Sequence, residues 1–89
     1  MEISFRKKTT RKLKQIKGKQ PALYKKIQKQ LRLFKLNPKH PSLRTHKLKG
    51  NLANTWSISI EDDVRMIYSV ENHEAIFIDL GTHDEVYKK

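Results

Sequence analysis

The spacing of apolar residues changes once along this 89-residue chain, and this change limits the possible folds more than any other feature. In the first half, Leu23, Ile27, Leu31 and Phe34 recur every three or four residues, which predicts one face of an amphipathic helix. In residues 56–70, "WSISIEDDVRMIYSV", apolar and polar residues alternate, which predicts strands with one buried face. The chain therefore joins a helical first half to a sheet-forming second half.

The helical half carries signals for where its elements start and end. A short strand is expected over residues 2–6, "EISFR", because its apolar residues alternate with polar ones. A helix should then start at a capping threonine, Thr9 or Thr10, and end at Gly18. A second helix is expected over residues 21–36, since it starts with a proline and an Asn-Pro pair follows it. The short link between these helices predicts an antiparallel hairpin.

The second half predicts three strands, over residues 56–61, 64–70 and 75–80, separated by short turns at Asp62-Asp63 and Asn72-His73. Strands joined in this way form an antiparallel meander. The order of strand, helical hairpin and three-strand meander predicts a single α+β domain over residues 1–89, with the helices packed on one sheet face. Residues 37–55 are expected to form a long connection between the two halves.

Basic residues are concentrated in the first half of the chain. Residues 1–50 contain 17 Lys or Arg and one acidic residue, whereas residues 51–89 contain three and eight. Such a positive field attracts phosphate backbones, which favours contact with nucleic acid or the ribosome. An acidic protein partner is the alternative, and a merely solvated lysine surface is the plainest interpretation. The residues expected to contact RNA are Lys25, Lys29, Arg32, Arg44, Lys47 and Lys49.

Several classes of protein are excluded by composition. The chain has no cysteine, so disulfides and thiolate metal sites are ruled out. No stretch approaches the roughly 20 apolar residues of a membrane span, and the first residues do not resemble a signal peptide. No phosphate-binding loop or cofactor fingerprint is present. We therefore expect a cytoplasmic protein with no cofactor, no metal and no membrane partner.

Arg65 is the first candidate for a functional residue, because it interrupts an apolar strand, "VRMIY". With Ser57 and Ser59 it falls on the sheet face away from the helices, which we expect to be open to solvent or ligand. Its guanidinium either pairs with one of the nearby carboxylates or clamps a phosphate through two parallel hydrogen bonds. The carboxylates within reach along the sequence belong to Asp62, Asp63 and Asp79.

Two histidines and a tyrosine are the other candidates. His83 follows a strand end at Gly81, and His46 lies in the basic connection. Two imidazoles can share the acid and base roles in RNA cleavage by the 2′-hydroxyl. Tyr87, four residues after His83, either stacks on an unpaired base or covers the sheet edge. The alternative for both histidines is an ordinary surface position.

The pieces "HKLKG", "VRMIY" and "GTHDEVY", in this order after a lysine-rich helical hairpin, resemble the RelE/ParE toxin superfamily. The resemblance covers nearly the whole chain and is greatest to the RelE-type mRNA interferases of the YafQ-like branch. It implies a toxin of a type II toxin–antitoxin pair that cuts mRNA in the ribosomal A site without metal, leaving a 2′,3′-cyclic phosphate. It also implies a cognate antitoxin as partner, in a toxin–antitoxin heterotetramer.

The same resemblance implies roles for individual residues. His83 matches the main catalytic histidine of the YafQ-like branch, and His46 matches a histidine in its acid–base chemistry. Asp63 matches a catalytic acidic residue of that branch, and Arg65 matches the arginine that contacts the scissile phosphate in RelE proper. Tyr87 matches a terminal aromatic residue that stacks on the base or takes part in proton transfer.

Two positions depart from the family pattern. Ser57 and Ser59 stand where RelE proper has lysines and where the YafQ-like branch has an acidic residue and a histidine. Because an unactivated serine is not a base at neutral pH, the resemblance then implies a slower enzyme or one that relies on His46, Arg65 and His83 alone. Two other functions remain open: a ParE-like toxin that binds DNA gyrase, and a nucleic-acid-binding domain without catalysis. A gyrase inhibitor has no need of a histidine pair.

Overall fold

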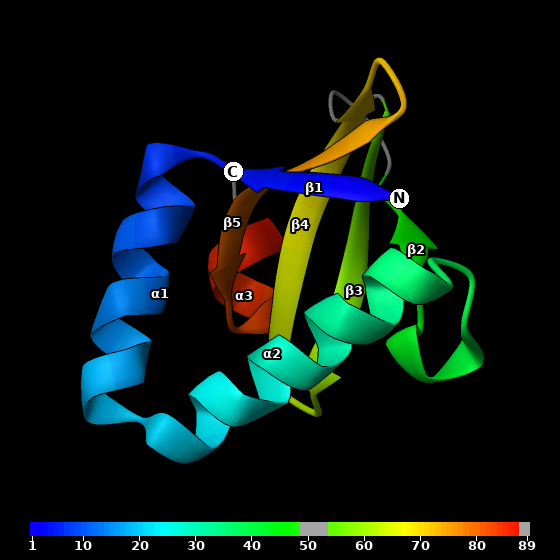
Figure 1. Ribbon diagram of the computed structural model, residues 1–89. Coiled ribbons are helices and arrows are strands. Elements are labelled where there is room, and N and C mark those ends of the chain that lie inside the picture. Colours follow the sequence, from blue (N-terminus) through cyan, green and yellow to red (C-terminus); the bar gives the residue numbers. More distant parts are fainter. Residues whose placement is uncertain (49–53, 88–89) are drawn as a thin grey trace.

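The computed structural model describes residues 1–48 and 54–87 of the chain, and it contains one five-stranded sheet with helices on both faces (Figure 1). Its elements in chain order are β1 (Glu2–Phe5), α1 (Lys7–Lys19), α2 (Pro21–Leu36), the 3-10 helix η1 (Pro41–Leu43), β2 (His46–Lys47), β3 (Thr55–Glu61), β4 (Val64–Glu71), β5 (Glu74–Gly81) and α3 (His83–Tyr87). This order confirms the predicted α+β fold, including the N-terminal strand, the helical hairpin and the meander.

The sheet has the strand order β1-β5-β4-β3-β2. Strands β3, β4 and β5 form the predicted antiparallel meander, and β1 lies parallel to β5 at one edge. Strand β2 pairs antiparallel with β3 at the other edge, inside the segment predicted as a connection. A two-residue strand carries too few residues for a pattern of alternation, which explains why the sequence did not indicate it.

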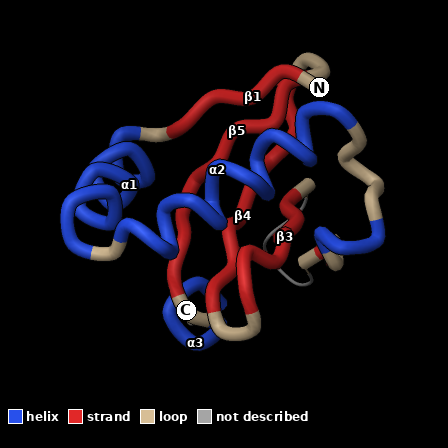
Figure 2. Tube along the Cα trace, turned by 60° about the horizontal axis from the view of Figure 1, so that its bottom comes forward, coloured by secondary structure: helices blue, strands red, loops and turns tan. Residues whose placement is uncertain are grey.

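Helices α1 and α2 pack on one face of the sheet, as predicted, and in Figure 2 α2 crosses in front of the strands while α1 lies to their left. Their lysines and arginines are mostly exposed on the outer surface of the hairpin. The longest helix, α2, has 16 residues. In the described part of the chain, no helix combines the length and the apolar character needed to cross a membrane.

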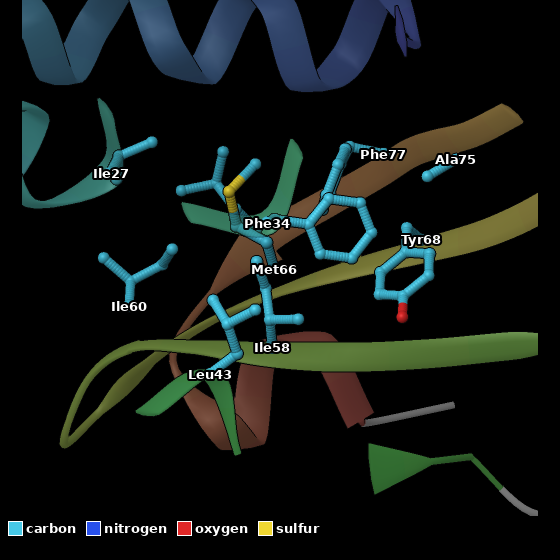
Figure 3. Close-up of a cluster of buried hydrophobic side chains, with 10 residues drawn as sticks. Ile27, Phe34, Leu43, Ile58, Ile60, Met66, Tyr68, Ala75 and Phe77 are labelled. Carbon is cyan, nitrogen blue, oxygen red and sulfur yellow. The ribbon is translucent and has the colours of Figure 1, made fainter. Parts of the chain in front are cut away.

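The main core lies between α2 and the sheet (Figure 3). Phe34 of α2 is fully buried, and its ring contacts those of Tyr68 and Phe77 edge-on at centroid distances of 4.9 and 5.4 Å. Ile27 from the same helix face is also fully buried. Because each such side chain contributes about 1.5–3 kcal/mol on burial, this aromatic cluster fixes α2 against the centre of the sheet.

The start of α1 differs from the prediction. The helix begins at Lys7, and Thr9 lies buried within it rather than capping it. The hydroxyl of Thr9 donates a 2.9 Å hydrogen bond to the backbone carbonyl of Phe77, which also accepts a 3.0 Å hydrogen bond from the backbone N–H of Arg6. Gly18 is likewise inside the helix, which continues to Lys19. The prediction was wrong because Thr9 is held by this contact with β5, which helix-capping signals in the sequence do not contain.

Asp79 anchors α1 to β5 by charge. Its carboxylate accepts from Lys12 Nζ at 2.6 Å and from the backbone N–H of Leu80 at 2.8 Å, and it lies 3.2 Å from Lys8 Nζ. Burial alone would raise the pKa of Asp79, but the hydrogen bonds from Lys12, Leu80 and Lys8 outweigh it and hold this pKa below its usual value. These charge-assisted bonds hold α1 against the part of β5 that extends beyond its pairing with β1.

Candidate functional site

Arg65 lies near the start of β4, the middle strand, on the sheet face away from the helical hairpin. Its Nε donates to Ser57 Oγ at 3.1 Å, and its Nη2 donates to the backbone carbonyl of Arg44 at 2.8 Å. Among the described residues no carboxylate pairs with it, and Asp79 instead binds two lysines of α1. The guanidinium is therefore fixed by two neutral acceptors and keeps its full positive charge for an anionic ligand.

The Arg44 carbonyl reaches Arg65 because of an unusual backbone conformation. Arg44 ends η1 in the left-handed region, with φ 46° and ψ 53°. That conformation costs a non-glycine residue about 1–2 kcal/mol, so it persists only where surrounding contacts favour it. The hydrogen bond from Arg65 Nη2 is one such contact. Sequence reasoning placed the side chain of Arg44 in the RNA-binding set but did not foresee the role of its backbone.

The face around Arg65 is less open than expected. Ser57 is completely buried, and Leu48, Ile67, Val86 and the half-buried Ile78 form a second, smaller apolar cluster on this side of the sheet. The prediction of an open face was wrong in this part because α3 folds back against β4 and β5 and brings Val86 onto Ile67. The half-buried Arg65 lies on the same face, two residues before Ile67 along β4.

A reciprocal pair of hydrogen bonds holds the start of α3. The backbone N–H of Thr82 donates to Glu85 Oε1 at 2.7 Å, and the backbone N–H of Glu85 donates to Thr82 Oγ1 at 3.2 Å. This is a capping box, and the sequence contains its signal, "THDE", which our reasoning did not use. His83 is the first residue of α3, so this cap fixes the backbone of the candidate catalytic histidine.

Gly81 is required by space rather than by a turn. It is the last residue of β5, and a Cβ added there would lie 2.6 Å from Glu85 Oε1, the atom that caps α3. The sequence-based reason for a glycine here, a sharp backbone turn, is replaced by this close approach. Gly81, Thr82 and Glu85 thus form one unit, which we call the α3 cap.

The two candidate histidines lie on either side of Arg65 across the sheet. His46 in β2 pairs with Ser57 in β3, and Arg65 in β4 pairs with Ser59 on one side and with Gly81 on the other. Since strands lie about 5 Å apart, β2 runs about 10 Å from β4. His83 follows Gly81 by two residues, and its side chain is exposed, with Nδ1 3.9 Å from Asp84 Oδ1. The order across this face is therefore His83, Arg65, His46.

The remaining predicted catalytic residues lie at the margins. Asp63 is exposed in the β3–β4 turn, two residues before Arg65, and it lines a shallow hollow together with Lys26, Glu61 and Asp62. Tyr87 is the last residue of α3, one helical turn after His83, and only its backbone is described. Across the described ranges, no three His, Asp or Glu side chains are grouped so that they could hold a metal ion.

The predicted RNA-contacting residues fall into two groups. Lys25, Lys29 and Arg32 are exposed on the outer face of α2, on the far side of the sheet from Arg65. Arg44 and Lys47 are exposed beside the site, with Lys47 Nζ 5.7 Å from the ring centre of Trp56. Lys49 lies outside the described residues. The molecule therefore presents positive charge on two opposite surfaces.

The chain matches a known protein family in sequence and known toxins in fold. A family model described as "Bacterial toxin of type II toxin-antitoxin system, YafQ" matches residues 1–88. A search of curated proteins found no match. Among solved structures, the chain is similar to a YoeB/ParE toxin from Agrobacterium tumefaciens, with a TM-score of 0.81 and 21% identity over 93% of this chain and 99% of that one.

Two further structures share the fold. YafQ from E. coli strain BL21(DE3) is 17% identical, with a TM-score of 0.79 and 97% of each chain covered. The YoeB toxin in a heterotetrameric YoeB-YefM toxin-antitoxin complex from Staphylococcus aureus is 23% identical, with a TM-score of 0.78 over 93% of this chain and 97% of that one. At these identities, the likeness shows a shared fold.

Proposed function

The chain belongs to the YafQ family of bacterial toxins of type II toxin–antitoxin systems, and we propose that it is an endoribonuclease that cuts mRNA on the ribosome. The observation that carries the proposal is the placement of the Arg65 guanidinium, which has no carboxylate partner among the described residues, between β2 with His46 and the start of α3 with His83. We propose that residues 1–89 form one toxin domain and that it acts in the cytoplasm, where mRNA is translated.

The proposed reaction is an attack of a ribose 2′-hydroxyl on the adjacent phosphorus. One imidazole of the pair His46 and His83 takes the proton of the 2′-hydroxyl, and the other gives a proton to the departing 5′ oxygen. The bond from phosphorus to the 5′ oxygen breaks as the bond to the 2′ oxygen forms. The products are a 2′,3′-cyclic phosphate and a free 5′-hydroxyl, with no net change in protons and no metal required.

Arg65 would stabilise the extra negative charge on the phosphorane. Its guanidinium is already oriented by Ser57 and the Arg44 carbonyl, so little reorganisation is needed when the charge develops. Asp63 and Tyr87 complete the proposed set, with Asp63 near the start of β4 and Tyr87 available to a base one turn of α3 beyond His83. Ser57 and Ser59 have no proton-transfer role in this scheme.

The basic surfaces have separate uses in the proposal. Arg44 and Lys47 would hold the mRNA strand near Arg65, whereas Lys25, Lys29 and Arg32 on the outer face of α2 would contact ribosomal RNA. Lys49, outside the described residues, is also proposed to bind RNA. A protein that inserts between mRNA and ribosome needs positive charge on both sides, which fits the two groups of basic residues.

We also propose that a cognate antitoxin binds and silences the chain in a heterotetramer. The proposal rests on the family and on two similar structures, a DinJ-YafQ complex from E. coli and the heterotetrameric YoeB-YefM complex from Staphylococcus aureus. The excess of positive charge, +11 over the chain, favours an antitoxin with acidic segments.

The test is to express the wild-type chain without antitoxin and to map new 5′ ends on a reporter mRNA. His83→Ala is the site variant. His73→Asn is the matched control, because His73 is exposed in the β4–β5 turn with φ 65°, a conformation that asparagine tolerates. We expect cuts at in-frame codon positions with the wild type and the control, and none with His83→Ala.

Two other outcomes would contradict parts of the proposal. Cuts that persist in His83→Ala would keep the ribonuclease and remove His83 from its site. Growth arrest without any cuts would reject the ribonuclease and point to an effect on another target, such as DNA gyrase.

A further inference from the structure

A second hollow lies on the sheet face that carries the helical hairpin, whereas the candidate active site lies on the opposite face. It is an open hollow of about 560 Å³ between Met1, residues 38–45 around η1, and the strands β3 and β4. Its apolar lining residues are Met1, Pro38, Pro41, Trp56, Tyr68 and Val70. The volume is in the range of pockets that enclose small ligands or anchoring side chains, about 300–1,000 Å³.

The hydroxyl of Tyr68 opens into this hollow. The Tyr68 ring is packed in the main core against Phe34 and Phe77, and the residue is only 5% exposed. Figure 3 shows its oxygen at the rim of the core cluster. No hydrogen bond to this oxygen forms within the part of the chain that the structure describes. Burial raises the pKa of Tyr68, so the hydroxyl stays protonated and can donate to an occupant.

Trp56 has a neighbouring side chain on each side of it in the sheet, Tyr68 from β4 and Lys47 from β2. The indole stacks on Tyr68 from β4, with 6.0 Å between ring centres and 19° between planes. On the β2 side, Lys47 Nζ lies over the ring at 5.7 Å. A nucleobase that stacks on an aromatic residue needs a free face. The covered indole therefore favours an inserted apolar side chain over a stacked base.

The rim of the hollow is positive. Lys39 and Arg44 contribute cationic side chains, and among the described lining residues there is no Asp or Glu. A segment that enters should therefore carry carboxylates beside its apolar side chain. Arg44 also links the hollow to the active site, because its backbone carbonyl accepts the hydrogen bond from Arg65 Nη2.

From these contacts we infer that the hollow between η1 and Trp56 is an anchor site for the antitoxin, which inserts one apolar side chain from an acidic segment. The inference rests on the proposed function for the existence of the antitoxin, and it adds the place and the chemistry of one contact. The bound segment contacts Arg44, a lining residue whose backbone carbonyl orients the Arg65 guanidinium.

The test measures the affinity of refolded toxin variants for the purified antitoxin encoded with the chain. Tyr68→Phe removes only the hydroxyl and should weaken binding about 2–10-fold, the value of one neutral hydrogen bond. Thr45→Trp places an indole at an exposed lining position and should weaken binding at least about 30-fold, as expected when an anchor is displaced. Lys39→Glu should weaken binding most at low salt.

Lys14→Glu is the matched control, because Lys14 is exposed on α1, away from the hollow. It makes the same change of net charge and should alter the affinity less than about twofold. Thermal unfolding of each variant establishes that it is folded before its affinity is compared. A pattern in which Tyr68→Phe and Thr45→Trp bind as tightly as the wild type would overturn the inference, and so would a wild type that does not bind.

Cleavage of a reporter mRNA by the same variants separates this inference from the proposed function. If Tyr68→Phe and Thr45→Trp lose cleavage while their antitoxin affinity is unchanged, the hollow holds RNA and the inference is wrong. If the wild type cuts no mRNA but the variants lose antitoxin affinity, the ribonuclease proposal fails and the anchor site stands.

Discussion

Arg65 donates from Nε to Ser57 Oγ over 3.1 Å, and Ser57 is completely buried behind it. The serine therefore acts as a fixed acceptor that orients the cation, a role that requires no basicity of the serine itself. Ser59 differs, because its hydroxyl donates only a longer 3.3 Å bond to the Glu61 carbonyl.

This difference predicts the effects of two matched substitutions. Ser57→Ala leaves the Nε of Arg65 without its acceptor and should lower the rate of mRNA cleavage about tenfold, the cost of one hydrogen bond to a charged group. Ser59→Ala should change the rate less than about twofold. Single-turnover cleavage on programmed ribosomes measures both. Equal effects of the two substitutions would mean that Arg65 does not depend on Ser57.

Two glycine substitutions test the α3 cap. Gly81→Ala would bring a methyl group 2.6 Å from Glu85 Oε1 and displace that carboxylate from the Thr82 N–H. We expect the free energy of unfolding to fall by about 1 kcal/mol, as for the loss of a helix cap, and cleavage to fall with it. Denaturant unfolding and the cleavage assay measure the two effects.

Gly18→Ala is the control for Gly81→Ala. A Cβ at Gly18 meets nothing within 4 Å, and the residue lies in α1. Alanine there should raise the free energy of unfolding by about 0.5–1 kcal/mol and leave cleavage unchanged. If Gly81→Ala behaved like Gly18→Ala, the cap would not position His83.

The histidine pair predicts the dependence of cleavage on pH. The wild-type rate should follow a bell-shaped profile, because one imidazole must be neutral and the other protonated. His46→Ala and His83→Ala should each lower the rate about 10²–10⁴-fold and should each remove a different limb.

A substrate with sulfur in place of the bridging 5′ oxygen assigns the two roles. The sulfur leaves without being protonated, so it should restore the rate of the variant that lacks the general acid and not that of the other. A variant that retains both limbs of the profile would show that its histidine is not part of the pair.

Asp79 predicts a stability effect that depends on pH. Its pKa lies below the usual value in the folded chain, so it contributes stability above the unfolded pKa of about 3.9, and this contribution is lost as the pH falls through the folded pKa. Asp79→Asn should lower the free energy of unfolding by about 2 kcal/mol at pH 7. The difference from the wild type should shrink as the pH falls below the unfolded pKa and through the lower folded pKa.

Urea unfolding across this pH range measures the effect. Asp62→Asn, in the exposed β3–β4 turn, is the control and should show a small difference at every pH. A deficit of Asp79→Asn that stays constant from pH 7 to pH 2 would show that the ion pairs with Lys8 and Lys12 do not stabilise the fold.

Much of the fold followed from local pattern. The stripe from Leu23 to Phe34 gave α2 within its observed bounds, and the alternation after Trp56 gave the meander. These signals are reliable because helix and strand periods follow from backbone geometry alone. The start of α1 and the strand β2 could not be found in this way, since Thr9 and His46 take their places from contacts with β5 and β3.

The candidate site, like the fold, was predicted only in part from the sequence. The residue types of the site can be read from the sequence: a strand arginine, two histidines, a terminal tyrosine, and the "THDE" signal that caps α3. The partners of these residues follow from the folded chain, in which Arg65 binds Ser57 and the Arg44 carbonyl rather than Asp79, and Gly81 makes room for Glu85. The reason is physical: periodicity fixes the face on which a side chain lies, but its partner depends on strand register and loop conformation, which are set by residues far apart in the chain.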